Sequence, residues 1–225
     1  MADKSEPLVI EVVSDVVCPW CFIGKRRLEK AIASRPDLSV EVHFRPYFLN
    51  DWVPREGISR TEYLTTKFGS VERYNQNAQR IVGVAASEGL TYAPEKIQRQ
   101  PNTTDCHRLI AWANAEGKEA RMKQRLMDLY FTEGADLTDR ETLVKAAAEV
   151  GLDGTRVREL LAGDTDVEHI TQAAESAKRA GIDGVPFFIF NGVLAVSGAQ
   201  SPEYLVSAME QSIEERAKRA AQATA

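Results

Sequence analysis

The sequence predicts an α/β fold in which both ends of the chain build one sheet and a large all-helical insertion separates them. Three observations predict this arrangement: a β-α-β pattern over residues 1–52, a β-β-α pattern over 182–225, and helix-type periodicity in the segment between them. The composition, 44% hydrophobic and 27% charged, is that of an ordinary globular protein.

The N-terminal unit opens with a buried strand, expected over residues 8–17 (LVIEVVSDVV) because β-branched side chains dominate this segment. Residues 22–34 place apolar side chains on one helical face and Lys and Arg on the other, which predicts an amphipathic helix. Apolar residues alternate over 39–49, as in a second strand. Pro46 must lie at the end of that strand or at a sheet edge, where its missing N–H group is tolerated.

The middle of the chain lacks a convincing strand pattern from residue 60 to residue 181, and helix-period segments follow one another there. Most of these segments end just before a glycine, as is typical where a left-handed residue closes a helix. The expected helices are 60–68, 71–87, 103–116, 118–132, 139–150, 154–161 and 165–180. We therefore expect a helical insertion domain at 53–181 and a discontinuous domain made of 1–52 and 182–225.

The C-terminal unit begins with two short strands, expected at 185–191 and 193–197. Asn191 and Gly192 join them, and an Asn-Gly pair between two apolar runs is the strongest short-range indication of a tight β-hairpin. The two ends of the chain thus supply the β-α-β and β-β-α halves of one sheet. Joined together, these halves make a thioredoxin fold.

A last helix is expected after the hairpin. Ser201 is predicted to cap this helix, and Pro202 to occupy its first position. Its apolar stripe consists of side chains spaced three or four residues apart, namely Leu205, Ala208, Met209 and Ser212. From Glu214 onward the tail is rich in alanine and charged residues, and we expect it to fray.

Two cysteines stand three positions apart, in the segment Cys18-Pro19-Trp20-Cys21, where the first strand gives way to the first helix. Pro19 suits the first helical position, so Cys18 is expected at the N-cap, with its sulfur facing free N–H groups and the positive end of the helix dipole. Such a site lowers a thiol pKa from ~8.5 to roughly 3.5–7.5. Cys21, one turn later, faces inward and can attack a mixed disulfide formed on Cys18. Trp20 offers a flat apolar surface beside the pair.

Zinc binding and a purely structural role are the alternatives for this cysteine pair. Zinc would need two further ligands, and the candidates show no paired spacing: Cys106, His107, His43 and His169. Cys106 lies on an apolar helical stripe, which favours packing, whereas His107 lies on the neighbouring face and is a weaker candidate for substrate contact. We therefore predict a redox-active dithiol and no metal site, provided that the Cys18 sulfur can be reached from a groove.

Four segments carry a resemblance to a known family: SDVVCPWCFIGKRRLEKA, RPYFLN, PNTTDCHRL and GVPFFIFNGVLAVSGAQSPEYL. Together they resemble the DsbA-like thioredoxin superfamily, and most closely its FrnE-like branch. That branch is related to 2-hydroxychromene-2-carboxylate isomerases and kappa-class glutathione transferases. The resemblance covers nearly the whole chain, and the first and last segments together are its most specific part.

The resemblance implies further site residues. It implies a cis bond between Val185 and Pro186, which turns the Val185 backbone toward an extended peptide or glutathione beside the dithiol. It matches Ala199 and Gln200 to positions that hold the γ-glutamyl end of glutathione in the transferases, although Gln200 replaces an acidic residue there. Asn102, which with the following threonine matches a family pair near the cleft, is expected either to bind substrate or to cap a helix.

The predicted function is that of a thiol–disulfide oxidoreductase that oxidises, reduces or isomerises disulfides of proteins or small molecules. Cys18 is the expected nucleophile and Cys21 the resolving cysteine. The alternatives are a glutathione-dependent transferase or isomerase acting on small aromatic substrates, in which relatives carry a single serine instead of Cys18, and a non-catalytic binding role of the helical block. No metal, nucleotide or flavin cofactor is predicted, and glutathione is a candidate co-substrate.

Charge and hydropathy restrict the expected partners and location. The formal net charge is −5 without a basic block, which disfavours nucleic acids and anionic membranes as partners. The apolar stretches are far shorter than the ~20 residues of a membrane helix. Residues 1–7 are polar and acidic, unlike a secretion signal. We expect a cytosolic protein whose oligomeric state is open, with a homodimer as one alternative.

Overall fold

The computed structural model describes residues 6–223 and places a four-stranded sheet, with strand order β2-β1-β5-β6, at its centre. Its strands are β1 (Leu8–Ser14), β2 (Val40–Pro46), β5 (Phe187–Phe190) and β6 (Leu194–Ser197). β1 pairs in parallel with β2 and antiparallel with β5, and β5 pairs antiparallel with β6. The predicted thioredoxin fold is confirmed. Most of the polar segment from which we argued against a secretion signal lies outside the described residues.

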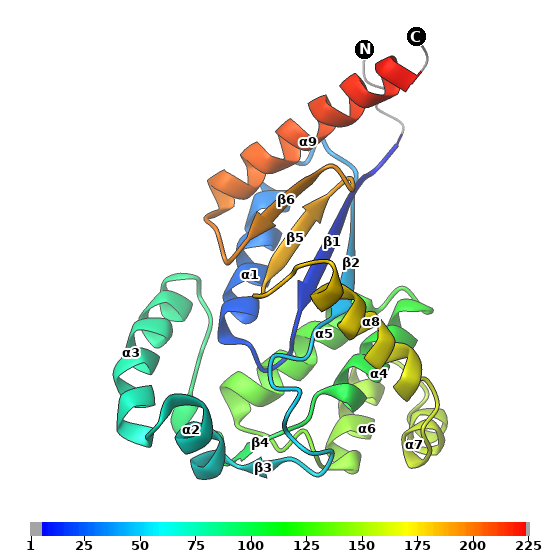
Figure 1. Cartoon of the computed structure of the whole chain (residues 1–225). Coiled ribbons are helices and arrows are strands. Elements are labelled where there is room, and N and C mark those ends of the chain that lie inside the picture. The colour runs from blue at the N-terminus through cyan, green and yellow to red at the C-terminus, as the bar shows by residue number, and fades with distance from the viewer. Residues whose placement is uncertain (1–5, 224–225) are drawn as a thin grey trace.

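Two helices from the ends of the chain cover one face of the sheet (Figure 1). α1 (Pro19–Ala33) and α9 (Pro202–Ala223) pack against each other and against the sheet. Their shared core consists of buried apolar side chains from five elements, including Ile10, Leu28, Phe188 and Leu205. The predicted stripe of α9 therefore faces the sheet.

Helices dominate the segment between β2 and β5, which confirms the predicted helical insertion. They are α2 (Arg60–Phe68), α3 (Val71–Ser87), α4 (Thr104–Asn114), α5 (Glu119–Asp128), α6 (Arg140–Glu149), α7 (Gly154–Ala162) and α8 (Val167–Arg179), with a 3₁₀ turn η1 (Pro94–Lys96) and a π-helical turn η2 (Leu129–Glu133). The insertion also holds a two-stranded pairing of β3 (Ile58–Ser59) with β4 (Arg99–Gln100). Two-residue strands are too short to produce an alternating pattern, so the sequence did not predict them.

The C-terminal end of β1 and the first turn of α1 are directed at the helical insertion (Figure 1). Residues from this junction, among them Val16, Cys21 and Phe22, share one buried apolar cluster with Leu109 of α4 and Met122 of α5. The position where the sequence predicts the reactive dithiol thus lies at the boundary between the sheet and the insertion.

Local sequence features explain most of the element ends. Pro46 is the last residue of β2, which is an edge strand, as predicted. Asn191 and Gly192 both have positive φ angles, 52° and 67°, as a type I′ hairpin turn requires. The structure corrects the expected fraying after Glu214, because α9 continues to Ala223. Alanine-rich composition and an ion pair one turn apart, between Arg219 and Glu215, favour that continued helix.

Candidate active site

Cys18 is the N-cap of α1, as predicted from Pro19 at the first helical position. Its backbone is extended, with φ −90° and ψ 113°, and its Sγ accepts a hydrogen bond from the Cys21 N–H at 3.4 Å. Hydrogen bonding with the Cys21 side chain is the largest influence on the Cys18 thiol and lowers its pKa, although burial acts in the opposite direction. The sulfur is therefore poised to ionise more readily than an ordinary cysteine.

Cys21 differs from Cys18 in its electrostatic setting. Burial raises the pKa of Cys21 well above its usual value, and the neighbouring Cys18 raises it further. Both cysteines are free thiols in the structure. They expose 3% and 1% of their surface, so Cys21 faces inward as expected, while Cys18 is more enclosed than a freely accessible nucleophile. The pKa values of the two sulfurs are thus shifted in opposite directions.

A buried acid and a buried histidine lie next to the dithiol. Asp15 follows β1 directly; one carboxylate oxygen accepts from the Leu49 N–H at 2.9 Å, and the other lies 3.3 Å from the His107 Nε2. Burial alone would raise the pKa of Asp15, but the contact with His107 and the Leu49 hydrogen bond outweigh it and lower that pKa. Burial lowers the pKa of His107 despite the same contact. His107 therefore supports the base of the site and does not reach its surface.

The segment before β5 forms the opposite wall of the site. The bond between Val185 and Pro186 is cis, and the Val185 carbonyl oxygen accepts from the Cys18 Sγ at 3.5 Å. Gly24 permits this approach, because a Cβ atom there would lie 2.8 Å from the Pro186 Cγ. The Pro186 carbonyl in turn accepts from the Gly198 N–H at 2.8 Å. The two C-terminal segments are thereby fixed beside Cys18.

Lys67 and Tyr63, both on α2 of the insertion, lie near Cys18. The Lys67 Nζ donates to the Asn50 Oδ1 and lies 5.6 Å from the centre of the Tyr63 ring. Burial lowers the pKa of Lys67, whereas the negative charges of Cys18 and Asp15 raise it. The Asn50 Nδ2 is buried without a hydrogen-bond partner. These groups are donors that an anionic substrate could use.

The fold and the cysteine pair can now be set beside known proteins. The family model of the DSBA-like thioredoxin domain matches residues 9–210, which include both halves of the sheet and the insertion. The chain belongs to the DsbA-like thioredoxin family. It is thus a member of a family of thiol oxidoreductases, whose substrates are thiols or disulfides, and the resemblance noted in the sequence is confirmed.

Three relatives show how far the likeness to this DsbA-like chain extends. A crystal structure from Streptomyces coelicolor, described as a probable DsbA oxidoreductase, is 31% identical with a TM-score of 0.84, covering 92% of this chain and 91% of that one. The uncharacterized protein YwbO of Bacillus subtilis (strain 168) is 28% identical over 201 residues, 89% of this chain and 94% of YwbO. The cytosolic disulfide reductase DsbM from Pseudomonas aeruginosa, solved with GSH, has a TM-score of 0.61 at 17% identity, covering 94% and 98%; this likeness concerns the fold.

The remaining predicted residues of this DsbA-like protein lie at different places around the site. Half-buried Trp20, Val185 and Ala199 pack against the apolar cluster that contains the dithiol. Gln200 is exposed, and its side chain bonds within its own turn to the Ser197 carbonyl. The Asn102 amide donates to the Val53 carbonyl, and its oxygen accepts from the N–H of Thr104, the first residue of α4; the N-cap itself is Thr103.

Sequence reasoning missed several groups of the site. Asp15 falls within the expected first strand and Lys123 within the expected helix at 118–132, and the sequence alone marks neither as a site residue. Lys67 and Asn50 carried no signal of their own, since their roles depend on contacts across the insertion. A buried carboxylate three residues before a reactive cysteine is the one local pattern that could have indicated Asp15.

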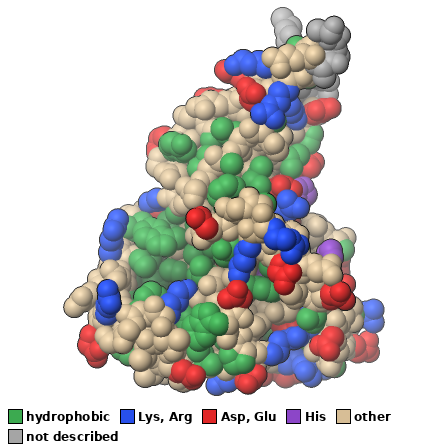
Figure 2. Space-filling view, in the orientation of Figure 1, with side chains coloured by type: hydrophobic (Ala, Val, Ile, Leu, Met, Phe, Trp, Pro, Cys, Tyr) green, Lys and Arg blue, Asp and Glu red, His purple; other side chains and the backbone are tan. Residues whose placement is uncertain are grey.

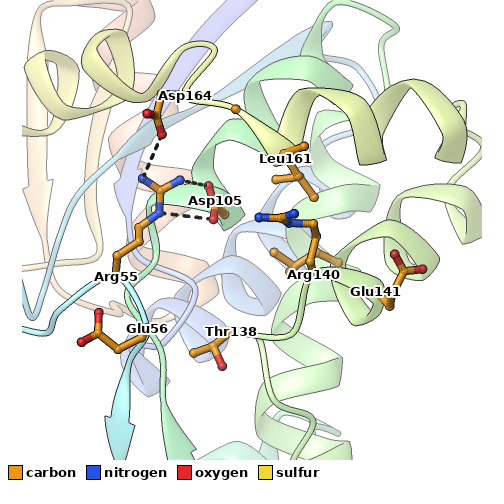
Figure 3. A pocket seen from close by; sticks show the side chains of 11 residues that line it. Arg55, Glu56, Asp105, Thr138, Arg140, Glu141, Leu161 and Asp164 are labelled. Carbon is orange, nitrogen blue, oxygen red and sulfur yellow. Dashed lines mark hydrogen bonds and ion pairs between the residues drawn. The ribbon is translucent and has the colours of Figure 1, made fainter.

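Two cavities among the described residues have neither Cys18 nor Cys21 in their lining. One, of 670 Å³, is lined by polar residues of the insertion, with Arg55 pointing at Asp105 and Asp164 (Figure 3). The other, of 300 Å³, includes Asn102 and Phe48. Within residues 6–223, no group of three or more His, Cys, Asp or Glu side chains is arranged to hold a metal ion.

The outer surface carries charges of both signs. On the face shown in Figure 2, acidic and basic side chains are interspersed over the insertion. Among the described residues, no helix is long and apolar enough to cross a bilayer.

Proposed function

We propose that this chain is a thiol–disulfide oxidoreductase in which Cys18 is the nucleophile and Cys21 the resolving cysteine. The observation that carries the proposal is the opposite electrostatic setting of the two sulfurs, since the Cys18 pKa is lowered at a helix N-cap and the Cys21 pKa is raised by burial. Such an arrangement favours attack by one defined sulfur.

The reaction is a pair of thiol–disulfide exchanges. The Cys18 thiolate attacks one sulfur of a substrate disulfide, a mixed disulfide forms, and the other substrate sulfur leaves as a thiolate that takes up a proton. Cys21 then loses its proton and attacks the Cys18 Sγ, which releases the second substrate thiol and closes the Cys18–Cys21 disulfide. The substrate is reduced by two electrons and the dithiol is oxidised; the reverse sequence oxidises a substrate dithiol.

The substrates we propose are disulfides of proteins or small molecules, with glutathione as a candidate co-substrate. The donors of Lys67 and Asn50 lie close enough to Cys18 to meet a carboxylate of a peptide bound there. DsbM, which shares the fold, was solved with GSH, and this agrees with glutathione as a candidate co-substrate.

The proposed substrate contacts are divided between two segments. We assign the backbone of Val185 and the ring of Pro186 to the substrate chain, because they flank the Cys18 sulfur. Ala199 is proposed only as a neighbour of the substrate chain. Its carbonyl oxygen already accepts a hydrogen bond from Arg27 at 2.7 Å and is therefore not assigned to the substrate. Gln200 and Asn102 are kept as weaker proposals, because their amides bond to backbone groups of their own surroundings.

The test measures the reduction of insulin disulfides by variants in which one cysteine at a time is replaced. We expect Cys18→Ser to lose activity, and Cys21→Ser to lose turnover and accumulate a mixed disulfide on Cys18. Cys106→Ala is the control, because Cys106 is fully buried in the apolar stripe of α4, so the activity should persist.

Two outcomes would contradict the proposed function. Full activity of Cys18→Ser would exclude thiol exchange through Cys18. Glutathione conjugation of aromatic substrates that survives Cys21→Ser would favour the transferase or isomerase alternative. The absence of a metal, nucleotide or flavin cofactor, the cytosolic location and the possible homodimer remain parts of the proposal that rest on the sequence.

A further inference from the structure

Lys123 is a buried cation that the thiol exchange described above leaves without a role. It lies in the middle of α5, and its side chain is fully buried. Its Nζ donates to the Ser14 carbonyl oxygen at 3.3 Å and lies 5.6 Å from the centre of the Phe44 ring. Among residues 6–223, no carboxylate lies within ion-pair distance of it. Because an ammonium group without a counter-charge is costly to bury, its place here calls for a function.

The surroundings connect Lys123 to the resolving cysteine. Ser14 ends β1, and the carbonyl of the next residue, Asp15, accepts from the Cys18 N–H at 3.3 Å. The backbone of Asp15 also lowers the pKa of Cys21. Burial lowers the pKa of Lys123, and among the negative charges that raise it, that of Cys21 is the largest. The ammonium and this sulfur thus lie around one short turn, inside one buried cluster.

Five other ionisable groups lie near this pair, and all of them except Cys106 have partners of their own. They are Asp15, Cys18, Cys106, His107 and Glu119. Asp15 is bound by His107 and the Leu49 N–H, and Glu119 accepts from the Phe44 N–H at 2.8 Å. Cys18 is stabilised at the start of α1. Cys106 takes no part in the exchange, so the resolving sulfur is the group of this set whose change of charge Lys123 can balance, together with the backbone of Asp15.

We propose that the Lys123 ammonium stabilises the Cys21 thiolate during the resolving step, so that the helical insertion contributes a positioning residue to the dithiol. The proposal rests on the thiol–disulfide exchange proposed above. In the mixed disulfide, Cys21 releases its proton to solvent and its thiolate attacks the Cys18 Sγ. The bond from Cys18 to the substrate sulfur breaks, and the electron pair leaves on that sulfur, which takes a proton from solvent. Lys123 stays protonated, and no further oxidant or reductant is consumed.

Rapid mixing of the reduced protein with Ellman's disulfide separates the two steps. Attack by Cys18 releases one thionitrobenzoate, and attack by Cys21 on the resulting mixed disulfide releases a second. The first phase tests the proposed function, and the second phase tests the role of Lys123. A protein without the first phase contradicts the proposed function itself, whereas a change confined to the second phase concerns Lys123 alone.

We expect Lys123→Met to slow the second phase about tenfold at pH 7 and to move the midpoint of its pH profile up by about one unit, because the thiolate loses a nearby positive charge. The first phase should change less than about twofold. Lys123→Arg should restore the second phase by returning the charge. The matched control is Lys25→Met, since Lys25 is also buried but pairs with Glu29 and Gln124.

An unchanged second phase in Lys123→Met, or equal slowing in Lys25→Met, would overturn the proposal. If Lys123→Met fails to fold, a reciprocal measurement remains, because a coupling between two groups acts on both of them. The titration midpoint of the Lys123 side chain, followed by nitrogen NMR, should then be higher in Cys18→Ser than in the Cys18→Ser/Cys21→Ser double variant. Equal midpoints would contradict the proposal.

Discussion

At the scale of single residues, the site is a set of buried ionisable groups. Cys18 and Cys21 are three residues apart, yet the pKa of the first is lowered and that of the second raised. The hydrogen bond with the Cys21 side chain, together with the N-cap position, lowers the pKa of Cys18, whereas burial raises that of Cys21. Pro19 made the cap predictable, whereas the contact between Asp15 and His107, which are far apart in sequence, needed the fold.

His107 predicts a dependence of stability on pH. Because burial lowers its pKa in the folded state, the unfolded chain binds a proton near pH 6.5 while the folded chain does not. The unfolded state therefore holds more protons below that pH, and the free energy of unfolding should fall as the pH drops from 7 to 5. The slope for one proton is at most about 1.4 kcal/mol per pH unit.

Urea unfolding of the wild type and of His107→Gln across this pH range measures the effect. The difference in stability between the two proteins should shrink toward acidic pH. His169→Gln serves as the control, because His169 lies exposed on α8. A difference that stays constant from pH 7 to pH 5 would show that His107 is not buried as a neutral group.

At the scale of elements, local patterns located the helices and strands well. The expected helices at 60–68 and 71–87 coincide with α2 and α3, whose N-caps are Ser59 and Ser70. The first strand, by contrast, ends at Ser14, three residues before its expected end. Apolar residues continue there because they enter the cluster shared with the insertion, which periodicity alone cannot distinguish from a strand.

Gly24 on α1 predicts a difference between two glycine substitutions. In Gly24→Ala the new Cβ would meet the Pro186 Cγ at 2.8 Å and the Phe188 ring at 3.3 Å. Overpacking of about 1–3 kcal/mol should outweigh the usual helical gain of about 0.5–1 kcal/mol, so we expect a net loss of stability. Gly83→Ala, in α3 with nothing within 4 Å, should instead stabilise the protein by that helical gain.

Urea midpoints of the two variants test this expectation. Gly24→Ala should also alter the rate at which Cys18 is alkylated, because Pro186 and the neighbouring Val185 carbonyl must move. Equal stabilisation by both substitutions would show that α1 and the segment before β5 are not in close contact.

At the scale of the whole molecule, the sheet and the insertion share a core. Val16, Cys21 and Phe22 from the first part of the chain are buried together with Leu109 and Met122 of the insertion. The ion pairs of Glu88, at the end of α3, with two basic residues of α1 add a second connection. The division into domains at 53–181 stays a prediction, and we expect the two parts to unfold together.

Cooperative unfolding can be followed through single tryptophans. Trp20 lies on α1 and Trp112 on α4, so variants that keep only one of them, with phenylalanine at the other tryptophan positions, report on the sheet and on the insertion separately. The two urea transitions should have the same midpoint, as two-state behaviour requires. Clearly separated midpoints would mean that the insertion is stable by itself.

The sequence thus predicted the fold and the dithiol but not the base of the site. Cys18, Pro19 and Cys21 are neighbours in sequence, and their roles follow from helix-capping chemistry. Lys67 and Lys123 come from two helices of the insertion, and their contacts depend on how those helices pack. Such long-range contacts leave no periodic trace in a single sequence.

The most direct test of the central claim is the pH dependence of Cys18 alkylation by iodoacetamide, with the modified residue identified by mass spectrometry. We expect modification at Cys18 with a midpoint clearly below the ~8.5 of an ordinary cysteine, even though little of the residue is exposed. A midpoint at or above that value, or modification at Cys106 in place of Cys18, would contradict it.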